Sequence, residues 1–131
     1  MLIALSNSSS AEIEGNSGDL RSLSRNIKEC ESVCSMPLPV PAKFDDRGLR
    51  YLQELVIRVD SGLLRVSGTN DQLLITGSKE KLGLFSDNID WLVESQATGI
   101  PHKRDHLHIE FYPGHFFLAE DALPLILIRQ D

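Results

Sequence analysis

The chain has 131 residues and a formal net charge of −6, with 41% hydrophobic and 24% charged residues. These values are typical of a globular domain, and they exclude a disordered chain, a collagen-like fibre and a coiled-coil rod. No apolar run approaches the ~20 residues of a membrane helix, and the start lacks a signal-peptide pattern, so we expect a cytoplasmic protein without a membrane partner. An acidic chain with no basic stripe is a poor candidate for nucleic-acid binding and is better suited to a basic protein partner.

The chain contains an internal repeat with an offset of 62 positions, in which residues 1–32 align without gaps on residues 63–94. The identical pairs are Leu2/Leu64, Ile13/Ile75, Gly15/Gly77, Leu20/Leu82, Ser24/Ser86, Asn26/Asn88 and Ile27/Ile89. A match that keeps its phase through a strand, a turn and a helix favours a duplicated unit. We therefore predict an α+β fold of two tandem ββαββ units, 1–62 and 63–131, within one compact domain.

The first unit is predicted to run as two strands, a helix, an extended proline-rich segment and a strand. The expected elements are strands at Leu2–Leu5 and Ala11–Glu14, a helix at 18–33, an extended segment at Pro37–Pro41 and a strand at Leu55–Val59. The helix has a buried stripe of Leu20, Leu23, Ile27, Cys30 and Cys34. Cys30 and Cys34 would share one helix face as small apolar residues, because two thiols make neither a disulfide framework nor a zinc site.

The second unit is predicted to repeat this order. The expected elements are strands at Leu63–Ser67 and Gln72–Thr76, a helix at 79–96, and strands at His106–Phe111 and Leu125–Ile128. Ser78 is the expected N-cap of the helix, and the last strand is apolar throughout, as in a strand covered on both faces. We expect each unit to form a mostly antiparallel sheet with one helix packed on it, and the two units either to join edges into one continuous sheet or to pack as a pseudo-dimer.

All four histidines lie between positions 102 and 115, and three candidate groups alternate in His106-Leu107-His108-Ile109-Glu110. On a strand, His106, His108 and Glu110 would line one face, which is a metal-ligand set by residue type and also a possible acid/base pair. Same-face neighbours on one strand are roughly 6.5–7 Å apart, which suits two ligands better than three. A solvent-facing side of a strand explains the same alternation without any chemistry.

Aromatic groups near this strand are further candidates for partner binding. Trp91 lies beside the buried stripe of the second helix, where a half-exposed tryptophan either covers the core or contacts a partner. Tyr112 and His115 lie in the aromatic loop that follows the histidine strand, at Pro113-Gly114.

From Gly77 onward, the chain resembles the immunity protein 32 family of bacterial polymorphic-toxin systems. The resemblance is carried by Gly77, the helix with Leu82, Phe85 and Ile89, the segments His106–Glu110 and Tyr112–His115, Leu118, Ala122, Leu123 and the strand Leu125–Ile128. It implies a small non-enzymatic binding protein without a cofactor, whose partner is a cognate toxin domain. The implied contact candidates are His106, His108, Glu110, Tyr112, His115 and Trp91. The first unit departs from this pattern, with Leu38–Ala42 where the histidine strand should be, and is expected to be structural.

Two alternatives remain open from the residues alone. The first is a metal-binding protein or small metal-dependent hydrolase that uses His106, His108 and Glu110. The second is a structural or oligomerising module whose exposed sheet edges pair between copies.

Overall fold

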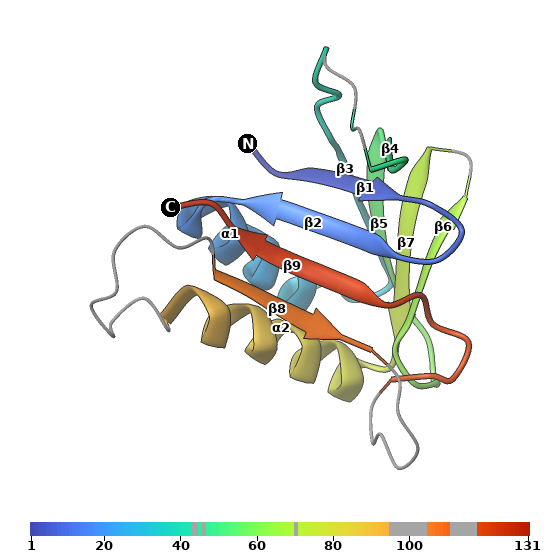
Figure 1. The fold of residues 1–131 in the computed structure, drawn as a ribbon. Coiled ribbons are helices and arrows are strands. Elements are labelled where there is room, and N and C mark those ends of the chain that lie inside the picture. The colour runs from blue at the N-terminus through green and yellow to red at the C-terminus, as the bar shows by residue number, and fades with distance from the viewer. Residues whose placement is uncertain (43–44, 46, 70, 95–104, 111–117) are drawn as a thin grey trace.

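The computed structural model describes residues 1–42, 45, 47–69, 71–94, 105–110 and 118–131, and within them the fold is α+β, with two helices and two mixed sheets (Figure 1). The strands are β1 (Ile3–Ser6), β2 (Ala11–Gly15), β3 (Val33–Pro37), β4 (Arg50–Tyr51), β5 (Glu54–Val59), β6 (Arg65–Thr69), β7 (Gln72–Gly77), β8 (Asp105–Ile109) and β9 (Leu125–Arg129). The helices are α1 (Ser17–Glu29) and α2 (Lys79–Glu94). Neither helix is long and apolar enough to cross a membrane.

Each sheet combines strands from both halves of the chain. Sheet A has the order β4-β1-β2-β9-β8, and sheet B has the order β3-β5-β7-β6. The β2/β9 and β5/β7 pairs, which join the two halves, are parallel, and the pairs that flank them are antiparallel. This corrects the expectation of one sheet for each unit, because hydrophobic alternation identifies a strand and its buried face but not its neighbours.

Both helices begin at the caps that their sequences provide. Asn16 and Asp19 form a reciprocal capping box at the start of α1, and Ser78 Oγ accepts a hydrogen bond from the Lys81 amide at 3.2 Å, as predicted for α2. These bonds satisfy amide groups that have no partner within the helix.

Helix α1 ends earlier than predicted. Cys30 has extended dihedral angles and caps the helix, and the chain then forms β3, which pairs with β5. Cys34 therefore lies on a strand, and the predicted shared helix face of Cys30 and Cys34 is wrong. Strand β3 pairs antiparallel with β5, as β8 pairs with β9, and Leu38–Ala42, where the first unit was expected to have its histidine strand, follows β3.

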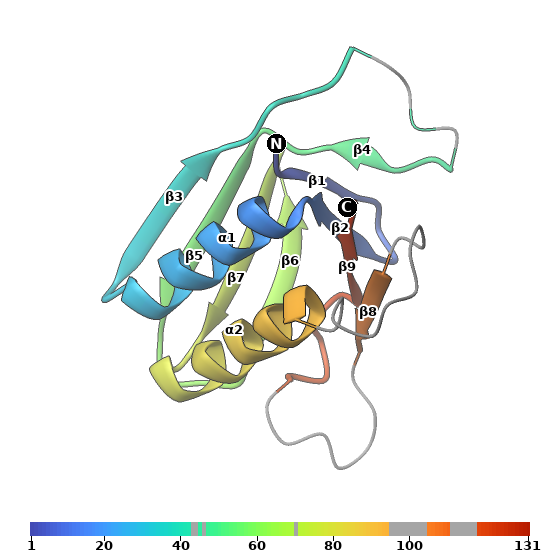
Figure 2. The same ribbon diagram turned by 90° about the vertical axis from the view of Figure 1, so that its left-hand side faces the viewer.

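The core lies where the two helices pack side by side in the angle between the sheets (Figure 2). The helices are antiparallel, and Lys79 Nζ at the start of α2 donates to the carbonyl oxygens of Lys28 and Cys30 at the end of α1. At the buried helix contact, Ser86 Oγ donates to the Ser24 carbonyl oxygen at 2.9 Å, and the two hydroxyl oxygens are 2.5 Å apart. The helices thus form a shared layer for both sheets.

Candidate functional site

Strand β8 and Glu110, which directly follows it, present the predicted ionisable residues on one open side. His106, His108 and Glu110 are exposed, whereas Ile109 is buried. The rings of His106 and His108 meet edge to face with centroids 5.2 Å apart, and His108 Nδ1 is 3.7 Å from Glu110 Oε1. The alternation in His106–Glu110 thus places these three side chains together at the margin of sheet A.

These residues continue into a wider surface, which we call the outer face of sheet A, on the side away from the helices. Residues that are directly opposed across paired strands share a face, so the outer face is set by the strand register. One row runs His108, Ile126, Glu12, Leu5, and the neighbouring row runs His106, Ile128, Glu14, Ile3. Figure 1 views sheet A from this side, with the helices behind it and no described element in front of β2, β9 and β8.

Strand β9 is covered on one side only. Leu125 and Leu127 are fully buried in the core, whereas Ile126 and Ile128 are partly exposed on the outer face. The predicted cover on both sides of this strand is therefore wrong. The two isoleucines give the outer face an apolar centre between the histidines of β8 and the glutamates of β2.

Glu12 is buried in the outer face and is paired with an arginine from the loop between β3 and β4. Arg47 Nη1 and Nη2 donate to the two carboxylate oxygens of Glu12 at 2.7 and 3.0 Å, and Arg47 Nε donates to Asp45 Oδ1 at 2.9 Å. The guanidinium lowers the pKa of the Asp45 carboxyl below its usual value, chiefly through this hydrogen bond. Conversely, hydrogen bonds to Asp45 and Glu12 raise the pKa of Arg47. Arg47 therefore fastens the loop to β2.

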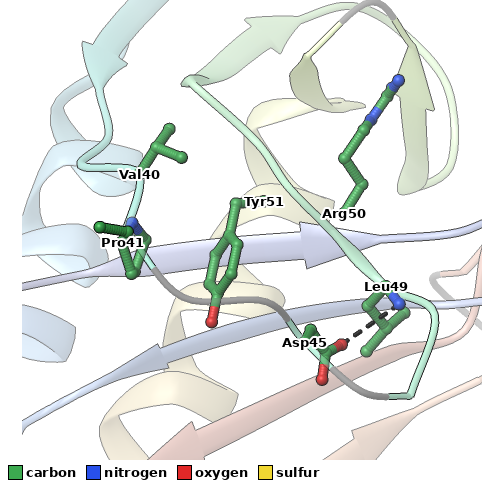
Figure 3. Close-up of a pocket in the computed structure, with 7 residues that line it drawn as sticks. Val40, Pro41, Asp45, Leu49, Arg50 and Tyr51 are labelled. Carbon is green, nitrogen blue, oxygen red and sulfur yellow. Dashed lines mark hydrogen bonds between the residues drawn. The ribbon is translucent and has the colours of Figure 1, made fainter.

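The same loop forms a largely apolar pocket of about 510 Å³ beside the outer face (Figure 3). Its lining residues are Val40, Pro41, Ala42, Asp45, Leu49, Arg50 and Tyr51. Asp45 Oδ2 accepts a hydrogen bond from the Leu49 amide at 3.2 Å, which closes the turn beneath the pocket. Tyr51 lies opposite Leu5 in the β1/β4 pair, so the pocket continues the row that contains Glu12.

Glu14, two residues further along β2, is as well shielded as Glu12 but has no comparable partner among the described residues. Its residue is 8% exposed, and its Oε1 accepts one long hydrogen bond, 3.4 Å, from Gln130 Nε2. A shielded carboxylate is ordinarily satisfied by a cation or by several donors. Glu14 thus accepts one hydrogen bond from the described residues, whereas Glu12 accepts two from a guanidinium.

The other predicted contact residues are less closely grouped. Trp91 lies on α2 and is 60% exposed, so it does not cover the core. Tyr112 and His115 lie outside the described residues. Glu12, Glu14 and Arg47 lie outside the predicted set of contact residues. The alternation in Ala11-Glu12-Ile13-Glu14 indicates one acidic side of a strand, but no local pattern places that strand beside β9.

The described residues give no support to a metal or thiol site. They include no group of three or more histidine, cysteine, aspartate or glutamate residues placed to hold a metal ion. Burial, together with the neighbouring Cys34 thiol, raises the pKa of the Cys30 thiol to about 11, so this thiol stays protonated and unreactive near neutral pH.

The fold and the outer face define an α+β protein with an open, partly apolar and ionisable sheet surface. In a comparison with protein families, residues 72–130 match the family described as Immunity protein 32, which confirms the predicted resemblance of the C-terminal part of the chain. The match spans β7, α2, β8 and β9. A search of curated proteins found no match.

Proposed function

We propose that this chain is an immunity protein of the bacterial cytoplasm, which binds a cognate toxin domain and holds it inactive. The observation that carries the proposal is the family match over residues 72–130, a segment that includes the whole histidine strand. The outer face of sheet A supports it, because an exposed sheet surface with apolar and ionisable side chains suits binding to another protein. His106, His108 and Glu110 are the contact residues of this face, and Trp91, Tyr112 and His115 are the further candidates.

The proposal is tested by capturing the tagged chain from its own cells and identifying any protein retained at near-equal stoichiometry. That protein is then expressed in a bacterial host with and without this chain. We expect growth arrest that the wild-type chain relieves and the double variant His108→Ala/Glu110→Ala does not. A matched double variant at the exposed α2 residues Glu80 and Asp87 should still relieve it. A retained protein that does not harm the host, or no retained protein at low salt, would contradict an immunity function.

We also propose that the two halves are copies of one ββαββ unit that have exchanged their last two strands. The register supports this: Ala11 faces Leu125 in sheet A, and Leu73, 62 positions after Ala11, faces Leu55 in sheet B. Two amide–carbonyl bonds repeat in the same way, with Gln130 N donating to Gly15 O at 2.9 Å and Asp60 N donating to Gly77 O at 2.8 Å. The contact between Ser24 and Ser86, also 62 apart, lies midway between the copies.

The exchange makes each half depend on the other for both sheets. We therefore expect fragments 1–62 and 63–131 to be unfolded when alone and to regain the spectrum of the intact chain when mixed, as measured by far-ultraviolet circular dichroism. A fragment that folds alone would refute this interdependence and favour two separate domains.

A further inference from the structure

We propose that Glu14 is the anchor of the outer face of sheet A and receives an arginine side chain from the surface of the protein partner. This inference rests on the proposed function for the existence of a partner, and it goes further by naming the chemistry that the partner must present. Glu12 and Glu14 lie on the same face of β2 but differ in their hydrogen-bond partners.

Glu12 is already occupied by an arginine of this chain. Both of its carboxylate oxygens receive a guanidinium N–H from Arg47, at 2.7 and 3.0 Å, in the bidentate geometry that arginine forms with carboxylates. Arg47 comes from a loop and reaches the sheet from outside. Glu12 thus shows that a guanidinium fits over the glutamates of this face.

Glu14 receives no guanidinium from the described residues. This carboxylate is shielded to a similar degree as Glu12, yet Gln130 supplies its one hydrogen bond, and no described residue donates to Oε2. Glu14 Oε2 is not among the fully buried, unpartnered side-chain atoms of the described residues, so it is open to the outer face and an incoming cation can reach it. A mostly shielded carboxylate gains more from such a cation than an exposed one does.

The surroundings of Glu14 on the outer face are largely apolar. Its neighbours across the strands are Ile3 on β1 and Ile128 on β9, and His106 lies beyond Ile128. These apolar side chains match the methylene stem of an arginine and keep water from the charge pair. The net charge of −6 favours the approach of a basic surface. Apolar flanks, a shielded carboxylate and negative charge together favour arginine over an anionic or uncharged group.

The first test needs no natural partner. A short oligoarginine peptide is titrated into the isotopically labelled chain, and amide chemical shifts are followed by NMR, with oligolysine and oligoglutamate peptides for comparison. We expect the chemical-shift changes to concentrate on β2, β9 and β8. The association constant of the oligoarginine peptide should fall about tenfold in Glu14→Gln. The matched control Glu80→Gln removes the same charge from the exposed start of α2 and should bind like the wild type. Shifts away from these strands, equal binding of Glu14→Gln, or equally tight binding of oligolysine would overturn the proposal.

The second test uses the captured protein partner. Glu14→Gln and Glu14→Ala should each weaken its binding about tenfold, mainly through faster dissociation, while the melting temperature of Glu14→Gln stays the same or rises. Unchanged affinity with a lower melting temperature would show that Glu14 is structural and would overturn the proposal. If the peptide result holds but no partner protein is retained, the arginine site stands and the immunity function fails.

Discussion

Removing Arg47 should leave a charge buried in the outer face, and the structure allows the cost to be worked out. The Glu12 side chain is 7% exposed and receives two charged hydrogen bonds from Arg47, which is itself 51% exposed. Breaking a fully buried ion pair from one side costs about 3–5 kcal/mol, whereas a solvent-exposed pair contributes about 0–1 kcal/mol. For this half-exposed pair we expect Arg47→Met to lower the free energy of unfolding by ~2 kcal/mol.

The cause of the lost stability in Arg47→Met can be isolated with a second substitution, Glu12→Gln, made both in the wild type and in Arg47→Met. In the wild type it should destabilise, because a neutral amide binds the guanidinium less strongly. In Arg47→Met it should instead stabilise by ~1 kcal/mol, because it removes the charge left without a cation. Urea unfolding followed by circular dichroism measures all four proteins. If Glu12→Gln lowers stability equally in both backgrounds, the interpretation of Glu12 as a buried charge held by Arg47 is refuted.

Three further perturbations test the helix contact, a buried arginine and the loop. Ser24→Ala and Ser86→Ala should each lower the free energy of unfolding by ~1 kcal/mol, and the double variant by less than the total, because the hydroxyls bond each other; strict additivity in urea unfolding would contradict this. Arg129, 2% exposed, donates to two carbonyls in the last turn of α2, so Arg129→Met should cost ~2 kcal/mol, and an unchanged melting temperature would be inconsistent with that role. Arg47 lowers the Asp45 pKa, so the stabilising effect of Asp45 is present above about pH 4 and is lost as the pH falls through its folded pKa. The melting temperature of Asp45→Asn should therefore depend less on pH in acid than that of the wild type. If the two proteins show the same dependence of melting temperature on pH, the loop contact is contradicted.

Local sequence signals predicted elements well where the chain itself determines them. The stripe of Leu82, Phe85 and Ile89 and the cap at Ser78 predicted α2, and the structure confirms both. Helix α1 was predicted too long because Cys30-Glu31-Ser32 contains no glycine or proline to stop it. What ends this helix is the pairing of β3 with β5, and such long-range pairing is absent from any local pattern.

The candidate site shows the same division between local and long-range information. The alternation from His106 to Glu110 predicted which side chains share a face, because strand geometry fixes that from one segment. The same segment could not indicate that Ile126 lies beside His108 or that Glu12 follows Ile126, because those neighbours come from strand register between distant segments.

The strand register joins the segment that matches the family to the first half of the chain. The matched residues 72–130 contribute β8 and β9 to the outer face, but the strand beside β9 is β2, from the first half of the chain. The first half therefore does more than support the fold, because it supplies Glu12 and Glu14 to the same surface as His106 and His108. In double-mutant cycles of partner affinity, the coupling energy between His108 and Glu12, which share one row, should therefore be larger than that between His108 and the adjacent Leu107, which faces the core.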